Sequence, residues 1–247
     1  MADAAFGRLD GLAGLVTGSG RGIGAGCAEA AAALGARVMV ADLELDRATE
    51  VAARITDAGG QAAASAVDVR DWRHVDELCD ATIETFGALD FVVANAGIGD
   101  YSSLHDGDPD RWRTVVETNL LGVLHTVRAA YARMKERRHG HIVLMASIAG
   151  RQTWVGEPVY IATKWGVVGL GWALRKEALE HNVRVTLIEP GMVDTPLVRS
   201  TPEGRSELER FAALSIDDVA RAVTFALAQP ESVGVSEVMI QPIGPEL

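Results

Sequence analysis

The sequence of 247 residues predicts an α/β fold: a doubly wound, mostly parallel seven-stranded sheet with helices on both faces, in a single domain. Three observations lead to this fold class. Short apolar runs alternate with helical stretches along the whole chain. The runs are rich in Val, Leu, Ile and Ala, which is typical of strands buried on both faces. A Gly-rich turn joins the first run to the first helical stretch.

The expected elements follow the chain in order. Strands are expected at Leu12–Thr17, Arg37–Ala41, Gln61–Val67, Leu89–Ala94, His141–Met145, Val183–Glu189 and Glu237–Ile243. Helices are expected near residues 22–34, 46–58, 72–86, 110–137, 158–181 and 217–228. Asp71 and Ser215 are suited to cap two of the helices.

We expect one domain over residues 1–247, because neither a Pro- or Ser-rich linker nor a repeat divides the chain. Residues 191–215 form the one long irregular stretch, and residues 192–215 of it are expected to serve as a substrate lid; a loose loop is the alternative.

Composition excludes several classes of partner. A net charge of −11 argues against nucleic acid or an anionic membrane as the main partner. No run of 18 apolar residues is present, and the N-terminal segment lacks the apolar stretch of a signal peptide. Cys27 and Cys79 fall in helical stretches and suggest neither a disulfide framework nor a metal site. We therefore expect a cytoplasmic protein that acts on a small molecule and binds no metal.

Tyr160 and Lys164, in Y-I-A-T-K, carry the strongest chemical signal. The chain has only three tyrosines and three lysines. Residues four apart share one face of a helix, so the phenol and the ammonium can act together in proton transfer. A phenol has an unperturbed pKa of about 10, and a nearby cation favours the phenolate. The alternative is an incidental surface pair.

The turn after the first strand is suited to a nucleotide. It reads T-G-S-G-R-G-I-G at residues 17–24. Backbone N–H groups of such a turn, and the helix N-terminus behind it, favour a pyrophosphate. The spacing is G-x3-G-x-G rather than the commoner G-x-G-x2-G, and glycines that serve only a tight turn are the alternative. The expected Rossmann-like site comprises Gly18, Gly20, Arg21, Gly22, Ile23 and Gly24.

The end of the second strand favours NAD over NADP. Asp42, which Leu43 follows, can accept hydrogen bonds from both ribose hydroxyls and would repel a 2′-phosphate. Arg21 argues the other way, because a cation there can hold a phosphate. A helix-flanking acid is the alternative for Asp42.

Two further strand ends fit the same nucleotide. Asp68 and Val69 end the third strand, where a carboxylate can accept from an adenine amino group. Asn95, Ala96 and Gly97 end the fourth strand, at the edge of the sheet that ligands cross in such folds. The alternatives are a helix cap at Asp68 and a contact between strands at Asn95.

A set of short motifs resembles the short-chain dehydrogenases/reductases of the single-domain kind over nearly the whole chain. The motifs are T-G-S-G-R-G-I-G at 17–24, D-V at 68–69, N-A-G at 95–97, Asn119, Ser147, Y-I-A-T-K at 160–164 and P-G-M-V-D-T at 190–195. In this order and spacing the set is highly specific. The resemblance implies a nicotinamide cofactor, and catalytic roles for Asn119, Ser147, Tyr160 and Lys164. It also implies cofactor contacts from Tyr160, Lys164, Pro190, Gly191, Val193 and Thr195.

Two departures from the family pattern stand out. Ala94 replaces a more usual Asn, although Asn95 is kept. The C-terminal S-E-V-M-I-Q-P-I lacks the Asp-Gly-Gly ending of acyl-carrier-protein reductases and looks closer to the branch that acts on small hydroxy acids and related alcohols. Members of that branch often prefer NADP.

The expected function is NAD-dependent hydride transfer between nicotinamide and a secondary alcohol, a ketone or a small hydroxy acid. Tyr160 is the expected general acid/base, Ser147 a donor to the substrate oxygen, and Asn119 the residue that orients a relay water, unless it bonds within its own helix. An NADPH-dependent carbonyl reductase and a non-catalytic dinucleotide-binding protein are the alternatives.

The substrate pocket and the subunit interface are less defined by the sequence. Arg151 is suited to grip a carboxylate, unless it and Glu157 only face solvent. A homotetramer, or a dimer, is expected through helices 110–137 and 158–181, where Trp165 and Trp172 share a face; a stripe facing the core is the alternative. The substrate candidates are Ser147, Arg151, Trp154, Glu157 and Met192.

Overall fold

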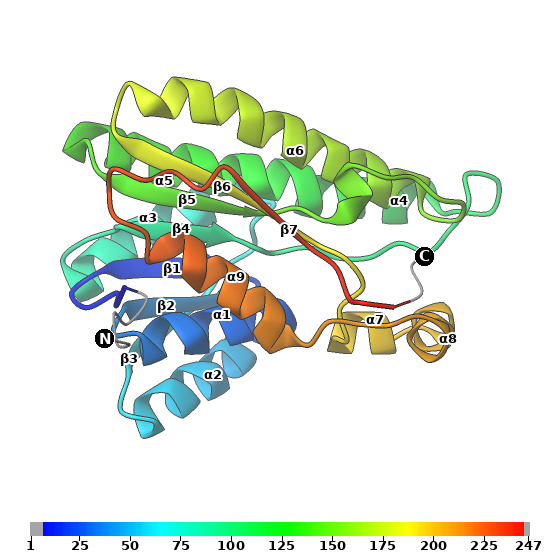
Figure 1. The fold of residues 1–247 in the computed structure, drawn as a ribbon, viewed down its shortest axis with the longest axis horizontal. Coiled ribbons are helices and arrows are strands. Elements are labelled where there is room, and N and C mark those ends of the chain that lie inside the picture. Colours follow the sequence, from blue (N-terminus) through cyan, green and yellow to red (C-terminus); the bar gives the residue numbers. More distant parts are fainter. Residues whose placement is uncertain (1–6, 245–247) are drawn as a thin grey trace.

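The computed structural model describes residues 7–244, so both ends of the expected domain lie outside the described residues (Figure 1). Its seven-stranded sheet has the order β3-β2-β1-β4-β5-β6-β7 and every neighbouring pair is parallel. The strands are β1 (Ala13–Thr17), β2 (Arg37–Asp42), β3 (Gln61–Ala66), β4 (Phe91–Ala94), β5 (Gly140–Met145), β6 (Val183–Pro190) and β7 (Glu237–Ile240). The predicted doubly wound fold class is confirmed.

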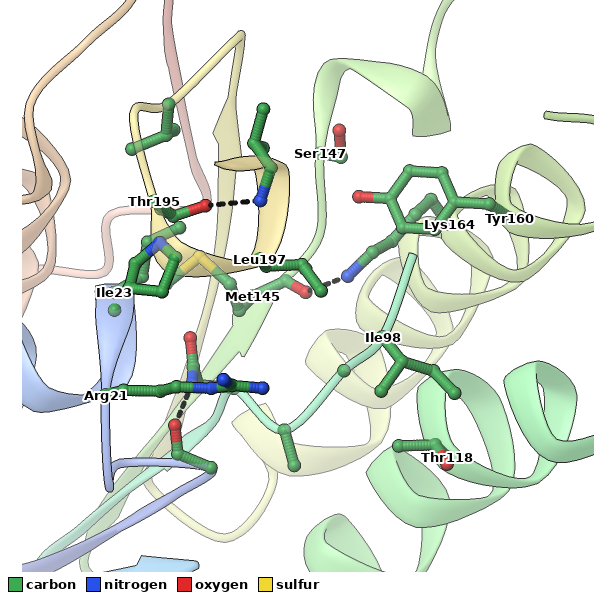
Figure 2. Close-up of a pocket in the computed structure, with 18 of the residues that line it drawn as sticks. Arg21, Ile23, Ile98, Thr118, Met145, Ser147, Tyr160, Lys164, Thr195 and Leu197 are labelled. Carbon is green, nitrogen blue, oxygen red and sulfur yellow. Dashed lines mark hydrogen bonds between the residues drawn. The ribbon is translucent and has the colours of Figure 1, made fainter. Parts of the chain in front are cut away.

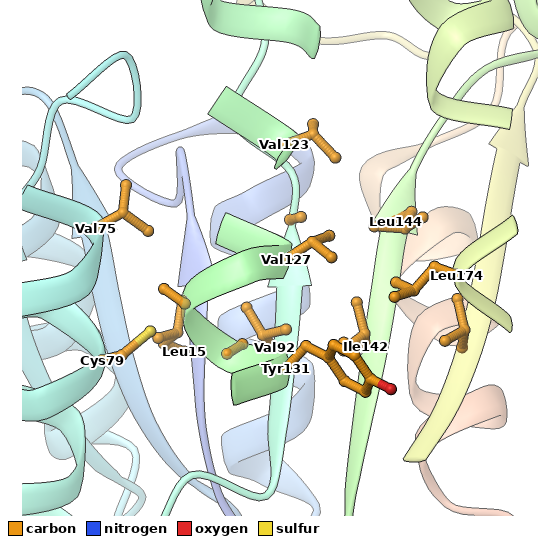
Figure 3. Close-up of a cluster of buried hydrophobic side chains, with 14 of the residues drawn as sticks. Leu15, Val75, Cys79, Val92, Val123, Val127, Tyr131, Ile142, Leu144 and Leu174 are labelled. Carbon is orange, nitrogen blue, oxygen red and sulfur yellow. The ribbon is translucent and has the colours of Figure 1, made fainter. Parts of the chain in front are cut away.

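Helices cover both faces of the sheet (Figure 1). On one face, α3 (Trp72–Phe86), α5 (Gly122–Arg137) and α6 (Pro158–Leu179) pack on side chains such as Leu15 and Ile142 (Figure 3). On the other face, α1 (Gly22–Ala33), α2 (Leu45–Asp57) and α9 (Ile216–Leu227) pack on side chains such as Val16 and Val143. Neighbouring residues of one strand thus point into opposite cores, which explains the continuous apolar runs in the sequence.

The strand order reverses at β1. The chain builds β1, β2 and β3 outward in one direction, and then returns to place β4 on the other side of β1. Connections that diverge in this way leave a crevice at the carboxyl ends of β1 and β4, where open α/β sheets bind their ligands. The Gly-rich turn and the Asn95 segment both lie at this edge.

The helix predicted over 110–137 is interrupted. It consists of α4 (Pro109–Val116), a π-helical segment, η1 (Glu117–Leu121), and α5. Asn119 is in the π-helical segment and has no exposed surface. Single π-helical turns inside α-helices are frequent at functional sites.

The stretch expected to be irregular over 191–215 is partly helical, which corrects the prediction. It contains α7 (Pro196–Arg199) and α8 (Pro202–Arg210). Thr195 and Thr201 cap these helices, each with a Pro at the first helical position. A hydroxyl cap followed by Pro is a helix start signal, so the starts of α7 and α8 could have been predicted from the sequence.

Candidate active site

The Gly-rich turn brings backbone to the nucleotide edge of the sheet. Gly18 has a φ of +63°, and a Cβ there would lie 2.7 Å from the Ala96 Cα. Helix α1 begins after Arg21, and no side chain caps it and no acidic residue lies in its first turn. Its N-terminal N–H groups therefore remain available to an anion, as a dinucleotide phosphate requires.

Asp42 closes this turn from the end of β2. Its Oδ2 accepts from the Gly20 N–H at 2.8 Å, and its Oδ1 accepts from the Glu44 N–H at 3.1 Å. Each carboxylate oxygen keeps accepting capacity, because an ionised carboxylate has about four acceptor sites. The residues present therefore fit a ribose with free hydroxyls beside the Gly-rich turn.

The strand-end residues join β4 to the same turn. Asn95 Nδ2 donates to the carbonyl oxygens of Thr17 and Gly18 at 3.0 and 3.1 Å. Asp68 is ion-paired to Arg70 at 2.6 Å, and that pairing lowers the pKa of its carboxyl. Asn95 therefore holds the ends of β1 and β4 together. This is the contact between strands that was the alternative to a ligand contact in the sequence-based prediction.

Asn119 ties three segments to one another. Its Oδ1 accepts from the Ile98 N–H, and its Nδ2 donates to the Ile98 carbonyl oxygen, both at 2.8 Å. Nδ2 also lies 3.5 Å from the Thr163 hydroxyl on α6. The side chain neither bonds within its own helix nor lines the cavity, so in this structure it positions the loop after β4 against α6.

Ser147, Tyr160 and Lys164 converge on one wall of the crevice. Figure 2 shows Ser147 near the hydroxyl end of Tyr160, with the Lys164 side chain beside the Tyr160 ring, and the two hydroxyl-bearing side chains are hydrogen-bonded. Lys164 Nζ donates to the Met145 carbonyl oxygen at 2.9 Å and lies 5.7 Å from the Tyr160 ring centroid. The predicted helical pair and the strand-end serine are therefore brought together.

Burial dominates the protonation of this group. It raises the pKa of Tyr160 to about 12; a hydrogen bond to Ser147 opposes the rise, and the Glu157 carboxylate adds to it. Burial also lowers the pKa of Lys164 to about 8. Lys164 is expected to lower the Tyr160 pKa together with a nicotinamide ring; in the protein by itself, desolvation of the phenolate is the largest influence on that pKa and raises it.

A cavity of about 470 Å³ connects Asp42 to Tyr160. Most of the predicted site residues line it. The cofactor-side residues are Gly18, Arg21, Gly22, Ile23, Asp42, Leu43, Asp68, Val69, Asn95, Ala96, Gly97, Pro190, Gly191, Val193 and Thr195. The reaction-side residues are Ser147, Trp154, Glu157, Tyr160, Lys164 and Met192. Gly20 and Gly24 support the turn from behind and, like Asn119, do not line the cavity.

Arg151, predicted to contact the substrate, lies outside the cavity. Its guanidinium binds Glu189, with Nη2–Oε1 at 2.8 Å, and also contacts the Glu237 carboxylate. Glu189 is only 1% exposed. A buried carboxylate needs a cation, so the Arg151 side chain is turned away from the site.

Several cavity residues were not foreseen from the sequence. Tyr101, Arg111 and Thr118 come from the segments that follow β4, and Glu207 comes from α8. Tyr101 follows the N-A-G motif by four residues and is one of only three tyrosines, which is a usable signal. Glu207 carries no signal beyond its place in the proposed lid.

Within residues 7–244, no cluster of three or more His, Cys, Asp or Glu side chains is arranged to hold a metal ion. Across that same range, every helix is too short or too polar to cross a membrane.

Comparisons with known proteins agree with this geometry. The sequence model described as short chain dehydrogenase matches residues 13–206. The chain belongs to the short-chain dehydrogenase family. An uncharacterized oxidoreductase of Staphylococcus saprophyticus is 38% identical to this dehydrogenase over 93% of its chain and 96% of the relative. An uncharacterized oxidoreductase of Staphylococcus aureus is 36% identical over the same shares.

Solved structures place the dehydrogenase in the same fold. A metagenomic short-chain oxidoreductase in complex with NADP superposes with a TM-score of 0.82 at 30% identity, covering 95% of this chain and 98% of its own. A short-chain type dehydrogenase/reductase from Mycobacterium marinum gives a TM-score of 0.89 at 27% identity, covering 95% of each chain. The family's NAD(P) chemistry thus agrees with the nucleotide crevice, and the chain is an oxidoreductase.

Proposed function

We propose that this dehydrogenase is NAD-dependent and transfers a hydride between nicotinamide and a secondary alcohol or ketone, with Tyr160 as the general acid/base. One observation carries the proposal. Tyr160, Ser147 and Lys164 share a wall of the cavity whose other end reaches Asp42. A dinucleotide spanning that cavity would bring its nicotinamide to the phenol.

The nicotinamide supplies the hydride acceptor in oxidation and the hydride donor in reduction. In oxidation, Tyr160 as phenolate takes the hydroxyl proton while the carbinol C–H bond gives up its electron pair, so the alcohol leaves as a ketone. Ser147 donates a hydrogen bond to the substrate oxygen as charge develops. Lys164 uses one N–H on Met145 and keeps two for the nicotinamide ribose.

The cofactor preference rests on Asp42. A carboxylate at the end of β2 would have to lie beside any 2′-phosphate, and like charges so placed cost several kcal/mol. Arg21 lines the same part of the cavity and supports the alternative, an NADPH-dependent carbonyl reductase. The NADP complex of the metagenomic relative concerns that protein, and it keeps the alternative in view.

A substrate panel with both cofactors tests the function and the preference together. Secondary alcohols, hydroxy acids and sugars should reduce NAD, with kcat/KM for NAD above that for NADP. Asp42→Asn keeps an acceptor for the Gly20 N–H but removes the charge, so the NADP/NAD ratio of kcat/KM should rise at least about tenfold. Asp46→Asn, on the neighbouring α2, should leave the ratio unchanged. A wild-type preference for NADP would favour the alternative.

The non-catalytic alternative has weaker support, since Asn119, Ser147, Tyr160 and Lys164 are all present. Cofactor binding without turnover of any compound in the panel would favour it. We further propose that segment 192–215 acts as the substrate lid within a single domain, and that the enzyme is cytoplasmic. A homotetramer through helices 110–137 and 158–181 completes the proposal.

A further inference from the structure

The reaction end of the cavity carries negative charge. Glu157 and Glu207 line it, together with the aromatic side chains of Tyr101 and Trp154. Tyr101 interacts electrostatically with both carboxylates and with Tyr160, so these groups surround a common space. This space is next to the proposed general acid/base.

Glu157 faces the cavity instead of capping its helix. It is the N-cap residue of α6, yet its side chain makes no capping hydrogen bond. It lies three residues before Tyr160 and so on the same face of the first turn. A hydrogen bond to Trp154 orients the carboxylate, and its charge acts directly on the Tyr160 phenol.

Glu207 lines the same cavity from α8. The two carboxylates repel each other: burial first, then the charge of Glu207, raise the pKa of Glu157 to about 7. Asp100 adds a further negative charge. Among residues 7–244, neither Glu157 nor Glu207 forms an ion pair.

The cations nearby are engaged elsewhere. Arg111 lines the cavity, but its Nη2 donates to the Gly99 carbonyl oxygen at 2.6 Å, and it is not among the charges that shift Glu157 or Glu207. Lys164 donates to Met145. Arg210 acts on Glu207 from the same helix and is exposed. Two partly buried carboxylates are thus left without a partner of opposite charge in direct contact, which is costly unless a ligand provides one.

A protonated amine matches this end of the cavity. Its three N–H donors suit carboxylate acceptors, and aromatic rings such as those of Tyr101 and Trp154 stabilise a cation. A carboxylate substrate would be repelled, and Arg151, the residue expected to grip one, is bound to Glu189 and Glu237.

We propose that the enzyme acts on amino alcohols and amino ketones, and that Glu157 and Glu207 bind the substrate ammonium while its hydroxyl or carbonyl oxygen faces Tyr160. This inference rests on the proposed function, and it names the substrate class. Glu157 and Glu207 then determine substrate specificity through the substrate ammonium.

Isosteric substrates test the proposal directly. Isopropanolamine and sec-butyl alcohol differ by an ammonium in place of a methyl group, and β-hydroxybutyrate supplies the anion; a homologue of each, one methylene longer, covers the reach of the pocket. We expect kcat/KM to be about 10- to 100-fold higher for the amine than for the neutral alcohol, as for hydrogen bonds to charged groups, and lowest for the anion.

The variants separate charge from shape. Glu157→Gln and Glu207→Gln should each remove most of the preference for the amine, so that the ratio of kcat/KM for isopropanolamine to kcat/KM for sec-butyl alcohol falls close to one. Glu209→Gln, an exposed change on the same α8 helix, is the matched control and should change neither value. Equal turnover of amine and neutral alcohol by the wild type, or equal losses on both substrates in the Gln variants, would overturn the proposal.

Failure of the proposed function has a different signature. If no compound is oxidised with either cofactor, calorimetry on the cofactor-loaded enzyme decides the amine site separately. Isopropanolamine binding that Glu157→Gln abolishes supports the site, whereas no binding by the wild type overturns it.

The pH dependence gives a second readout. Glu207 on α8, Asp100 and Tyr101 in the loop after β4, and Tyr160 on α6 all face Glu157. Because the Glu157 pKa is raised to about 7, the carboxylate becomes neutral as pH falls through that value. The amine preference in kcat/KM should fall with it in the wild type. A preference that is flat across this range would contradict the role of Glu157.

Discussion

At the residue scale, burial shapes both members of the Tyr160–Lys164 pair. Removing a phenolate and an ammonium from water disfavours each charge, so the two pKa values move apart, to about 12 for Tyr160 and about 8 for Lys164. The i, i+4 spacing placed both residues on one face, as predicted. Their protonation depends on the desolvation that strand β5 and helix α6 impose, which no local pattern contains.

The contacts of Asn119 could not be predicted from its place in the sequence. Its identity and position were singled out through the family motif, but its partners, the backbone groups of Ile98, come from a loop 21 residues earlier. The π-helical segment that carries it has no signature in E-T-N-L-L. Such a distortion is set by tertiary contacts, here to Ile98 and Thr163, rather than by local propensity.

At the element scale, Arg151 links three parts of the sheet edge. It follows the short 3₁₀ turn η2 (Ile148–Gly150) after β5, and it pairs with Glu189 at the end of β6 and Glu237 at the start of β7. The pairing fixes the segment that leads into α6, and hence Tyr160. We therefore predict that Arg151 acts in positioning and stability.

Arg151→Met should lower the free energy of unfolding by about 3 kcal/mol, because it leaves the buried Glu189 without its cation. Urea denaturation measures this. The control Arg54→Met breaks the exposed Arg54–Glu29 pair, and should cost less than about 1 kcal/mol. A loss from Arg151→Met no larger than that of the control would contradict the positioning role.

Most elements were predictable because burial imposes its pattern on them. Each predicted strand was found with its ends within three residues. The central strands β1, β4 and β5 are buried throughout and therefore apolar, which is the pattern that made them predictable. Helices α7 and α8 were not predicted, because they are too short to show an apolar periodicity. Thr195-Pro196 and Thr201-Pro202 are nevertheless helix start signals. Arg151 does not line the cavity because Glu189 and Glu237, from distant segments, bind its guanidinium. Glu207 was not foreseen because only the fold brings α8 to the cavity.

At the scale of the whole molecule, exposed apolar side chains gather on η1, α5 and α6. Trp165 is 48% exposed, Trp172 is 37% exposed, and Leu121 and Leu124 are similarly exposed. The alternative of a core-facing stripe is therefore wrong for the tryptophans. Helix α6 contains three glycines, and two of them pack inward, Gly166 against Leu120 and Gly171 against Leu187. A Cβ at Gly169 would meet nothing within 4 Å, which leaves room for a second subunit.

Light scattering should return the mass of a tetramer, and Trp172→Glu should shift it to a smaller species by placing a charge in the apolar contact. Trp72→Glu is the matched control, since Trp72 is also exposed but lies on α3. A wild-type monomer, or an unchanged assembly in Trp172→Glu, would count against the proposed interface.

The most direct test of the central claim replaces Tyr160 by Phe and measures turnover and cofactor binding in parallel. The account predicts that Tyr160→Phe binds NADH as the wild type does and loses about 10²- to 10⁴-fold in kcat, since only the proton-transfer group is removed. Tyr131→Phe, which removes a phenol on α5 that bonds to the Glu177 carbonyl oxygen, should retain activity. Turnover near the wild-type rate in Tyr160→Phe, with NADH still bound, would contradict the account.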